Sequence, residues 1–587
     1  MAWKGNWTTV FAKLNSRRFL QRWIDFDKQD MPPIWRTFDR FDAMIALAIL
    51  IFTILFCLER LQGDFPHILL GGDAANIVSF ALAKLHPEWF AGDFLLGDLQ
   101  NFQLYFQFHV PYIIWLNQWL GNPALALLTL LPVSVLLYLW GLYWLGKVLF
   151  RHRLWAASLL LLNAIPMYLP VDDIGILPDP LPRHLFQALL VYLLALAILW
   201  KDKPPTWLLM AFAMGILVYF HAVSTPAWIA ALCGGWIVCL PATWSWKQKL
   251  WFLFSLIVVL LITLLPFGFN YQQSLGQARE LPSGVSYAEF MQVFTTYYNT
   301  PDLHNILPTT KTILVTLALV GLLPFGLTGF IIGGLLAGSR SKELLILVIW
   351  FAAIGLISVV LPALEKKIEA HFQLLPLQTE LFRGVRFFRF LLSLIGLWGI
   401  SLLVHRVRKP IPLAALFLAM VVIIVIRSYS NPRTLQFLQF PQTWQCLQKG
   451  QLICQEPSPL VEVMLFVRDH TPQGSPIFFT PSYQDTASLC VRYLANRPLV
   501  YSWKDRGLGF TRPDKFWEWY EVFQKFAKVK FPKKWLNKYP VDFIAYIKGL
   551  GARYLVLDCP CPELPPSLQQ TMPVLYENLA YKVYALP

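Results

Sequence analysis

Acidic residues among apolar ones mark the first part of this chain where side chains could do chemistry. The stretch GGDAANIVSFALAKLHPEWFAGDFLLGD, residues 71–98, follows an apolar run closely and holds Asp73, Asp93 and Asp98. A carboxylate in such a place can accept a proton or bind a cation. For Asp73 an ordinary helix N-cap is the alternative, since a good helical sequence follows it. For Asp93 and Asp98 a solvated turn is the favoured interpretation.

Two more acids lie on a later polar stretch. Asp172 and Asp173 are adjacent, with Asp179, Arg183 and His184 close by in the sequence. Hard divalent cations such as Mg²⁺ or Mn²⁺ require several oxygen ligands, which Asp73 with Asp172 or Asp173 would supply. The alternative is a polar, proline-rich loop cap. The identity of any metal stays open.

The most informative basic patch is ELFRGVRFFRF, residues 380–390. Arg383, Arg386 and Arg389 recur every three residues at one end of an apolar segment, and helical spacing predicts that they lie near one face. A guanidinium presents a fork of donors that fits phosphate. Two alternatives are contact with lipid head groups and ion pairing within the chain. The acidic partners in the second case would be Glu365, Glu369 or Glu380.

A histidine and a long loop complete the set of candidates. His221 ends an apolar segment in YFHAVSTP, where a structural, hydrogen-bonded histidine is favoured over a substrate contact. The loop 269–310 is rich in tyrosine, which suits either sugar stacking or an interfacial belt. The chain has no Walker loop, no Rossmann fingerprint and no H-E-x-x-H motif, so nothing indicates nucleotide use.

The composition indicates the kind of structure that positions these residues. The 587 residues are 56% hydrophobic and only 14% charged, whereas soluble proteins carry roughly 25% charged residues. Residues 42–427 alternate between long apolar runs and short polar loops, and 428–587 resemble ordinary soluble sequence. We therefore predict an α-helical polytopic membrane protein with a C-terminal soluble α/β domain. The net charge of +15 does not indicate nucleic-acid binding, because much of the excess lies in loops beside spans.

About eleven segments approach the ~20-residue crossing length. They are 42–60, 124–148, 154–170, 183–200, 206–221, 225–241, 249–268, 311–335, 343–362, 385–404 and 410–427. With the tail 1–41 in the cytoplasm, every short inside loop is basic, as the positive-inside rule requires. The loops 61–110, 171–183, 269–310 and 363–384 then lie outside, as does the domain 428–587. We expect a multi-pass protein of the plasma (inner) membrane with a periplasmic C-terminal domain.

The C-terminal domain contains most of the cysteines. Helical patterns alternate with short apolar strands, including SPIFFTP, RPLVYSW and RYLVLD. A disulfide between Cys446 and Cys454 is the first prediction for an oxidising compartment, and pairing of Cys490 with Cys559 or Cys561 is a further alternative. Zinc is less favoured, because a C-x-C without a nearby histidine does not match the usual spacing.

The plan resembles that of the GT-C superfamily of membrane glycosyltransferases, which includes oligosaccharyltransferase catalytic subunits, protein mannosyltransferases and aminoarabinose transferases. The stretch FVRDHTPQGSPIFFTPSYQD, residues 466–485, is similar to the start of the soluble domain in oligosaccharyltransferase-like proteins. RPLVYSWKD and FWEWY look like bacterial multi-pass proteins of unassigned function in the same superfamily. SYQD stands where a WWD-type acceptor motif is expected, which argues against protein N-glycosylation.

The resemblance implies a lipid-phosphate-sugar-dependent glycosyltransferase. Its donor would be a polyprenyl-phosphate-linked sugar, and its acceptor a glycan, lipid or protein outside the membrane. Asp73 matches the acid of the first outside loop that serves as base, and Arg383 and Arg386 match arginines that contact the lipid phosphate. Two other classes stay open: a lipid or glycan transporter or flippase, and a non-catalytic membrane assembly protein with the same fold.

Overall fold

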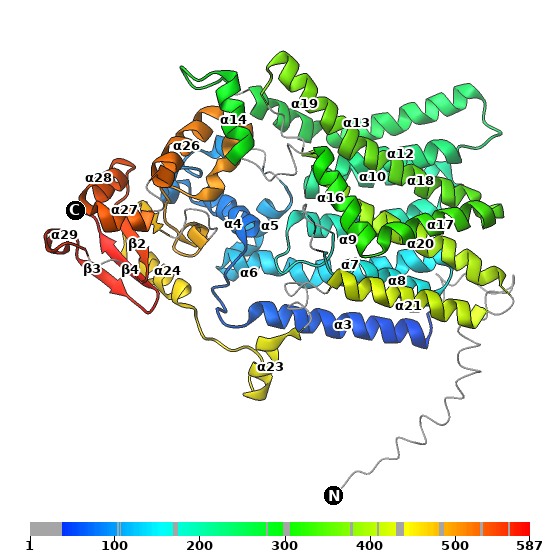
Figure 1. Ribbon diagram of the computed structural model, residues 1–587, viewed down its shortest axis with the longest axis horizontal. Helices are drawn as coiled ribbons and strands as arrows, with labels where there is room; N and C mark the ends of the chain where they lie inside the picture. Colours follow the sequence, from blue (N-terminus) through cyan, green and yellow to red (C-terminus); the bar gives the residue numbers. More distant parts are fainter. Residues whose placement is uncertain are drawn as a thin grey trace, which may run out of the picture.

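The chain folds into a bundle of apolar helices and a mixed α/β region formed by its C-terminal part (Figure 1). The computed structural model describes residues 38–102, 105, 107–167, 169, 174–276, 280–297, 306–375, 380–407, 410–429, 439–480, 487–528, 532–560 and 564–587. Helices α4 (Gly72–Leu85) and α5 (His109–Leu120), which follow the first span in sequence, lie between the bundle and the C-terminal region (Figure 1). Their place makes this segment the junction of the two parts.

By length and composition, seven helices of the described residues can cross a membrane, or eight if a pair bent by 78° is one span. The seven are α3 (Arg40–Leu61), α6 with α7 (Pro123–Leu128 and Leu130–Phe150), α9 (Pro182–Leu199), α10 with α11 (Pro204–Ile216 and Val218–His221), α13 (Trp246–Gly276), the continuous η4, α18, η5 and α19 (Gly338–Arg340, Ser341–Gly355, Leu356–Val360 and Leu361–Phe372), and η6 with α20 (Leu381–Arg386 and Phe387–Arg406). The bent pair is α16 (Ile306–Leu319) with α17 (Leu322–Leu336). The chain is a helical polytopic membrane protein.

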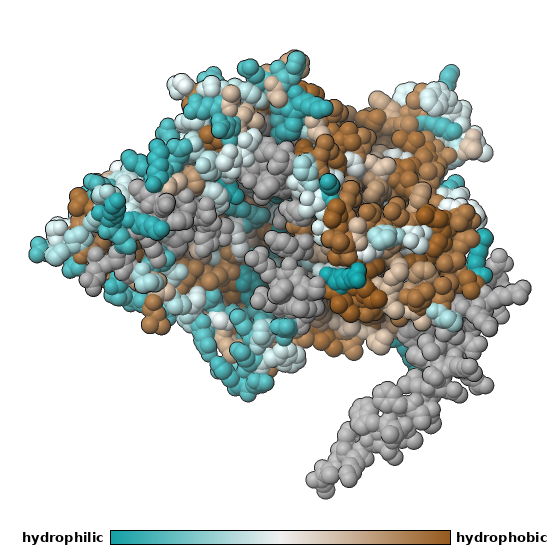
Figure 2. Space-filling view, in the orientation of Figure 1, coloured by the Kyte–Doolittle hydropathy of each residue, from teal (hydrophilic) through white to brown (hydrophobic). Residues whose placement is uncertain are grey.

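Two of the eleven predicted spans hold shorter helices. α8 (Arg153–Asn163) has 11 residues and α12 (Thr225–Cys239) has 15. α21 (Pro410–Tyr429) has 20 residues, which is the usual crossing length. Each predicted segment therefore contains a helix, but α8 and α12 fall short of the length that spans a bilayer unaided. On the face seen in Figure 2, apolar residues predominate over the bundle, whereas hydrophilic residues predominate over the C-terminal region.

α20 is the central helix of the bundle. In an 18-residue apolar stretch of this helix, 94% of the residues are buried, as expected for a sequence that is apolar on every face. It packs closely on α17, where a Cβ at Gly329 would lie 2.4 Å from the Cα of Gly396. The small residues allow the two backbones to approach. The N-terminal end of α20 carries the arginine patch, so this rigid contact fixes where the patch lies.

Two buried carboxylates bind the basic residues predicted to set the topology. Asp42, at the start of α3, contacts Lys147 Nζ at 2.8 Å and Arg153 Nε at 3.1 Å. Glu343, in α18, accepts from Arg340 Nε at 2.7 Å and from Trp398 Nε1 at 3.2 Å. The basic loops at this end of the bundle are therefore partly neutralised inside the protein.

The C-terminal region contains a four-stranded mixed sheet in the order β1-β2-β4-β3. β1 (Ile477–Phe479) runs parallel to β2 (Tyr554–Asp558), with Ile477 opposite Tyr554. β4 (Tyr581–Ala585) is antiparallel to both β2 and β3 (Val574–Glu577). The predicted strand RPLVYSW is wrong, since Leu499 makes only an isolated bridge with Ile477.

Short helices surround this sheet and form the described parts of the loops that were predicted to lie outside, which we call the outer loops. In the C-terminal region they are α23 (Pro441–Gln448), α24 (Pro459–His470), η8 (Ala487–Leu489), α25 (Cys490–Tyr493), η9 (Trp503–Phe510), α26 (Pro513–Lys528), α27 (Pro532–Lys538), α28 (Pro540–Gly549) and α29 (Pro566–Thr571). In the outer loops they are α4 (Gly72–Leu85), η2 (Pro87–Phe90), η3 (Leu99–Phe102), α5 (His109–Leu120) and α14 (Tyr287–Tyr297). These helices, with the sheet, bring residues far apart in the sequence into one body.

The cysteines follow the first prediction. Cys446 and Cys454 form a disulfide, with a Cα–Cα distance of 5.7 Å. Cys490 keeps its thiol, whose sulfur lies 3.5 Å from Tyr493 Oη, while Cys559 is in a disulfide. The alternative pairing of Cys490 is therefore wrong, and Cys561 lies outside the described residues.

Candidate active site

Asp73 stands in the first turn of α4. The N-cap of this helix is Gly71, which has no side chain to cap with, so the alternative that Asp73 is the N-cap is wrong. The positive end of the helix dipole favours a carboxylate in the first turn. The Asp73 side chain retains 47% of its surface exposed and points to space that solvent or a ligand can reach.

The start of α4 is held by residues of three segments. Arg60, at the end of α3, donates from Nε and Nη2 to Asp179 Oδ1 at 2.9 and 2.6 Å. The other oxygen of Asp179 accepts from the Gly71 amide at 2.7 Å, and the Leu70 amide donates to Tyr493 Oη at 2.7 Å. These bonds fix the backbone that carries Asp73.

Glu59, which precedes Arg60 in the sequence, holds the end of α3 to another segment. Its carboxylate accepts from the Thr443 amide and hydroxyl, both at 2.8 Å. The two charged residues therefore tie the end of α3 to different partners, one in an outer loop and one at α23.

A methyl group at Gly71 should disturb this arrangement. A Cβ built there would lie 2.8 Å from Asp179 Oδ2, so Gly71→Ala must push the carboxylate away from the helix start. Misplacement of a reacting group by about 1 Å costs on the order of 10²-fold in rate. We expect a fall of about this size in the activity proposed below, at normal protein abundance in the membrane. Gly268→Ala is the control, because its Cβ would meet nothing within 4 Å; equal activity of the two variants would contradict the prediction.

A cluster of cations surrounds the Asp73 carboxylate. Its Oδ1 lies 2.6 Å from Nζ of Lys504, which belongs to η9 of the C-terminal region and is 31% exposed. Partial desolvation raises the pKa of this carboxyl, but the positive charges of Lys504, Arg183 and Arg383 outweigh that effect and hold the pKa well below its usual range. Asp73 is therefore ionised at neutral pH and sits in a strongly positive field.

The three predicted arginines separate into two environments. Arg383, in η6, pairs with Glu380 at 3.0 Å and stays partly exposed near Asp73. Arg386 is fully buried and donates from Nε to the Arg383 carbonyl at 2.7 Å. Arg389 is fully buried in α20 and donates to the carbonyls of Ile165, at 2.9 Å, and Leu162.

These contacts decide which arginines can be proposed as phosphate ligands. Arg389 satisfies carbonyls at the end of α8, which otherwise lack partners within the helix. It therefore stays outside the phosphate site proposed below. Ion pairing with Glu380, named above as an alternative, applies to Arg383. Arg383 and Arg386 are three residues apart in a 3₁₀ turn, where side chains at this spacing lie on one face, so the two residues differ in their partners and burial.

Tyr105 and His221 complete the surroundings of the cluster. Partial desolvation and the carboxylates of Asp73 and Glu380 raise the pKa of Tyr105, which is 37% exposed, so its hydroxyl stays protonated and can donate. His221, at the end of α11, lies within the electrostatic reach of Arg386 and two other arginines of the cluster. Its buried Nδ1 has no hydrogen-bond partner among the described residues, so the favoured interpretation of a hydrogen-bonded structural histidine finds no support at that atom. Tyr105 was not singled out from the sequence.

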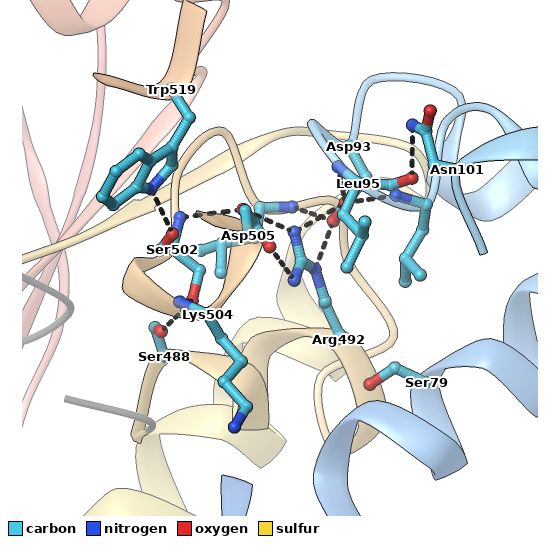
Figure 3. Close-up of polar contacts among 12 residues, drawn as sticks. Ser79, Asp93, Leu95, Asn101, Ser488, Arg492, Ser502, Lys504, Asp505 and Trp519 are labelled. Carbon is cyan, nitrogen blue, oxygen red and sulfur yellow. Dashed lines mark hydrogen bonds and ion pairs between the residues drawn. The ribbon is translucent and has the colours of Figure 1, made fainter. Parts of the chain in front are cut away.

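Asp93 lies in a buried ionic network and not in a solvated turn, which corrects that prediction (Figure 3). Both of its oxygens accept from Arg492 of α25, at 2.7 and 2.8 Å. Arg492 also donates to Asp505 of η9 at 2.8 and 3.1 Å. Burial raises the pKa of Asp505 to about 6, against the opposing charge of Arg492. We call the Asp93–Arg492–Asp505 set the interdomain clamp, because it joins the first outer loop to the C-terminal region.

Asp98 makes a similar but more open link. It pairs with Arg512 Nη1 at 3.1 Å and accepts from the Gln100 amide at 2.9 Å, with 46% of its side chain exposed. The prediction of a solvated turn therefore agrees with the surroundings of Asp98. Neither Asp93 nor Asp98 contributes a carboxylate to the space around Asp73.

The surroundings of Asp73 do not fit a divalent cation among the residues that the structure describes. Its charged neighbours there are Lys504, Arg183 and Arg383. Within the described ranges no group of three His, Cys, Asp or Glu residues has the geometry to hold a metal ion. Asp172 and Asp173, which were predicted as further ligands, lie outside the described residues, and no step below involves a metal.

An apolar cavity of about 830 Å³ lies between α19 and the outer loops. Its apolar wall includes Leu361, Leu364, Ile368 and Leu381, and Leu381 begins the same 3₁₀ turn as Arg383. Polar residues on its rim include Tyr287, whose hydroxyl donates to the Glu369 carbonyl at 3.1 Å. The cavity-lining Leu381 and the Arg383 guanidinium therefore belong to one short turn, two residues apart.

Comparison with known proteins identifies no family. No protein-family model matches the chain, and no curated protein matches it. Among solved structures, the chain is similar to the crystal structure of ArnT from Cupriavidus metallidurans bound to undecaprenyl phosphate. That similarity covers 93% of this chain and 98% of the other, at 13% sequence identity and a TM-score of 0.43. A similarity of this extent carries no argument about the site, so function is argued from the residues described above.

Proposed function

We propose that this protein is an integral membrane glycosyltransferase of the GT-C type. It transfers a sugar from a polyprenyl-phosphate-linked donor to an acceptor outside the cytoplasm. One observation carries the proposal: the ionised, partly exposed carboxylate of Asp73 lies among Lys504, Arg183 and Arg383. A carboxylate for the acceptor proton and cations for a phosphate leaving group are the two charges that this reaction requires.

The proposed reaction is a single displacement at the anomeric carbon. A new bond forms between the acceptor oxygen and that carbon, and the bond from the carbon to the phosphate oxygen breaks. The electron pair of the broken bond stays on the lipid phosphate, where the cationic side chains stabilise it. The acceptor's hydroxyl proton passes to Asp73 and then to solvent, which leaves the free carboxylate for the next cycle.

The apolar cavity beside Arg383 suits the other half of the donor. A polyprenyl chain carries no polar groups, and a cavity lined mainly by leucine and isoleucine binds such a chain by the hydrophobic effect. The guanidinium of Arg383, two residues after the cavity-lining Leu381, would then meet the phosphate. We assign the phosphate to Arg383 with the Lys504 and Arg183 charges, and the chain to this cavity.

We further propose that the N-terminus is cytoplasmic and the C-terminal domain periplasmic, with the protein in the inner membrane. The Cys446–Cys454 disulfide supports an oxidising compartment for that domain. Alkaline phosphatase fused after Pro587 should therefore be active, whereas a fusion after Lys201, in a basic loop, should be inactive. The opposite pattern at comparable expression would refute the orientation.

The function is tested by a glycan and glycolipid profile of cells that lack the gene. We expect one glycan or glycolipid to be lost, and wild-type protein to restore it while the lipid-linked sugar donor accumulates in the unrescued cells. Donor accumulation distinguishes a missing transferase from a failure to make the donor. An unchanged profile would refute the proposal. A lipid-linked sugar confined to the cytoplasmic leaflet would support the flippase alternative.

A further inference from the structure

Lys504 stands on a turn that is fixed from several sides. Ser502 caps η9, with its Oγ accepting from the Lys504 amide at 3.2 Å and its own amide donating to Asp505 Oδ2 at 3.0 Å. Trp519 of α26 donates to the Ser502 carbonyl at 3.0 Å, and Ser488 Oγ lies 3.1 Å from Ser502 Oγ. The backbone around Lys504 has little freedom, so the side chain alone can change partner.

The interdomain clamp sets that turn against the segment that holds Asp73. Asp505 of the clamp is the residue next to Lys504, and Asp93 belongs to the same outer loop as Asp73. Asp93 also accepts from the Leu499 amide at 2.7 Å, which adds a backbone link between the two segments. In Figure 3 the Lys504 side chain extends away from the clamp. The clamp therefore positions an ammonium group from the C-terminal domain at Asp73.

The contact between Asp73 and Lys504 differs from the clamp in one respect. Both partners keep exposed surface, 47% for Asp73 and 31% for Lys504, whereas the clamp residues are buried. A partly exposed ion pair is worth only about 0–1 kcal/mol, so another anion can displace one partner. A flexible lysine with a compact charge is suited to such an exchange.

Resting on the function proposed above, we propose that Lys504 is a donor-phosphate ligand supplied by the C-terminal domain, and that it leaves Asp73 for the phosphate when the donor binds. The exchange makes and breaks no covalent bond. It makes the C-terminal domain a part of the active site, because without this domain the phosphate loses one of its cations.

The exchange also changes the proton affinity of the Asp73 carboxylate. In the resting protein the cations around Asp73 favour its ionised form, which makes it a weak base. A phosphate bound to Lys504 and Arg383 offsets their charge and adds a negative one. The affinity of Asp73 for a proton then rises when the donor is in place, which is when the acceptor hydroxyl must lose its proton.

Binding to the purified full-length protein in nanodiscs tests the proposal. The probes are undecaprenyl phosphate, the uncharged alcohol undecaprenol, and phosphatidylglycerol as a general anionic lipid. We expect Lys504→Met to weaken undecaprenyl phosphate binding about tenfold or more, as loss of a charged hydrogen bond does, and to leave undecaprenol binding unchanged. Lys504→Arg should stay within about threefold of wild type, because it keeps the charge.

For Asp73→Asn we expect the affinity for undecaprenyl phosphate to change in the opposite direction. If the carboxylate competes with the phosphate for Lys504, this variant should bind undecaprenyl phosphate several-fold more tightly than wild type. If the pair only organises the site, the same variant should bind more weakly. Lys515→Met is the matched control: Lys515 also pairs with a carboxylate, Glu518 at 2.6 Å, and is 35% exposed, but it lies on α26. Its loss should change affinity less than twofold.

The outcomes separate the two proposals. If wild-type protein binds undecaprenyl phosphate no better than undecaprenol or phosphatidylglycerol, the proposed function fails. If wild type prefers the phosphate but Lys504→Met binds it equally well, the function stands and the role of Lys504 is refuted. A Lys504→Met variant that loses both the phosphate and the alcohol indicates a structural role and also refutes it.

Discussion

Asp73→Asn should lower the rate of sugar transfer by about 10²–10⁴-fold, the usual contribution of a positioned acid or base. Asparagine has nearly the same shape but cannot accept the acceptor's proton. Because the variant loses chemistry and keeps the binding groups, the fall should appear in kcat, with KM for the lipid donor unchanged or lower. Transfer of radiolabelled sugar by purified protein measures both constants.

Asp98→Asn is the matched control for this substitution. Asp98 belongs to the same outer loop, its side chain is 46% exposed compared with 47% for Asp73, and it also pairs with one cation of the C-terminal region. Its transfer rate should stay within about threefold of wild type, since loss of an exposed ion pair costs about 0–1 kcal/mol. A full rate for Asp73→Asn would show that another group removes the proton. Equal losses in both variants would point to loop structure.

The largest effect on stability is expected for Arg492→Met. This change removes the guanidinium between two buried carboxylates and leaves both without their cation. Breaking a buried ion pair by removal of one partner costs about 3–5 kcal/mol. We expect the C-terminal domain to separate from the outer loop, which limited proteolysis of the detergent-solubilised protein would detect as early cleavage, and we expect transfer activity to fall with it.

A second arginine, and a variant that also removes the two acids of the clamp, make this prediction specific. Arg468 pairs with Asp469 at 2.9 Å, but at the surface. Arg468→Met should therefore lower the free energy of unfolding by no more than about 1 kcal/mol. Adding Asp93→Asn and Asp505→Asn to Arg492→Met removes the uncompensated charges and should restore part of the protection. A triple variant as sensitive as Arg492→Met would mean that packing, and not charge, holds the two parts together.

The sequence predicts the apolar helices well, because crossing a bilayer demands long apolar runs that little else produces. The place of Asp73 at the start of a helix also follows from its neighbours. The environment of Asp93 does not, because its partner Arg492 is 399 residues away and nothing near either residue marks the pair. Lys504 was missed for the same reason.

Two further features depend on contacts that local sequence does not reveal. The spacing of Arg383, Arg386 and Arg389 does not show that Arg389 donates to a carbonyl at the end of α8, 224 residues earlier in the chain. RPLVYSW has the composition of a strand, yet Leu499 makes one bridge only. The amide of Leu499 donates to Asp93 instead, so a side chain occupies the place of a neighbouring strand.

The clamp residues are far apart in the sequence, so the ribosome synthesises them at different times. The ribosome adds Asp93 399 residues before Arg492, which at about 5–20 residues per second is a delay of roughly 20–80 s. During this interval the segment that carries Asp73 lacks both the clamp and Lys504. If the proposed function is right, a nascent chain lacks a complete site until its C-terminal region has folded against this loop, and a chain that terminates before Arg492 has neither the clamp nor Lys504.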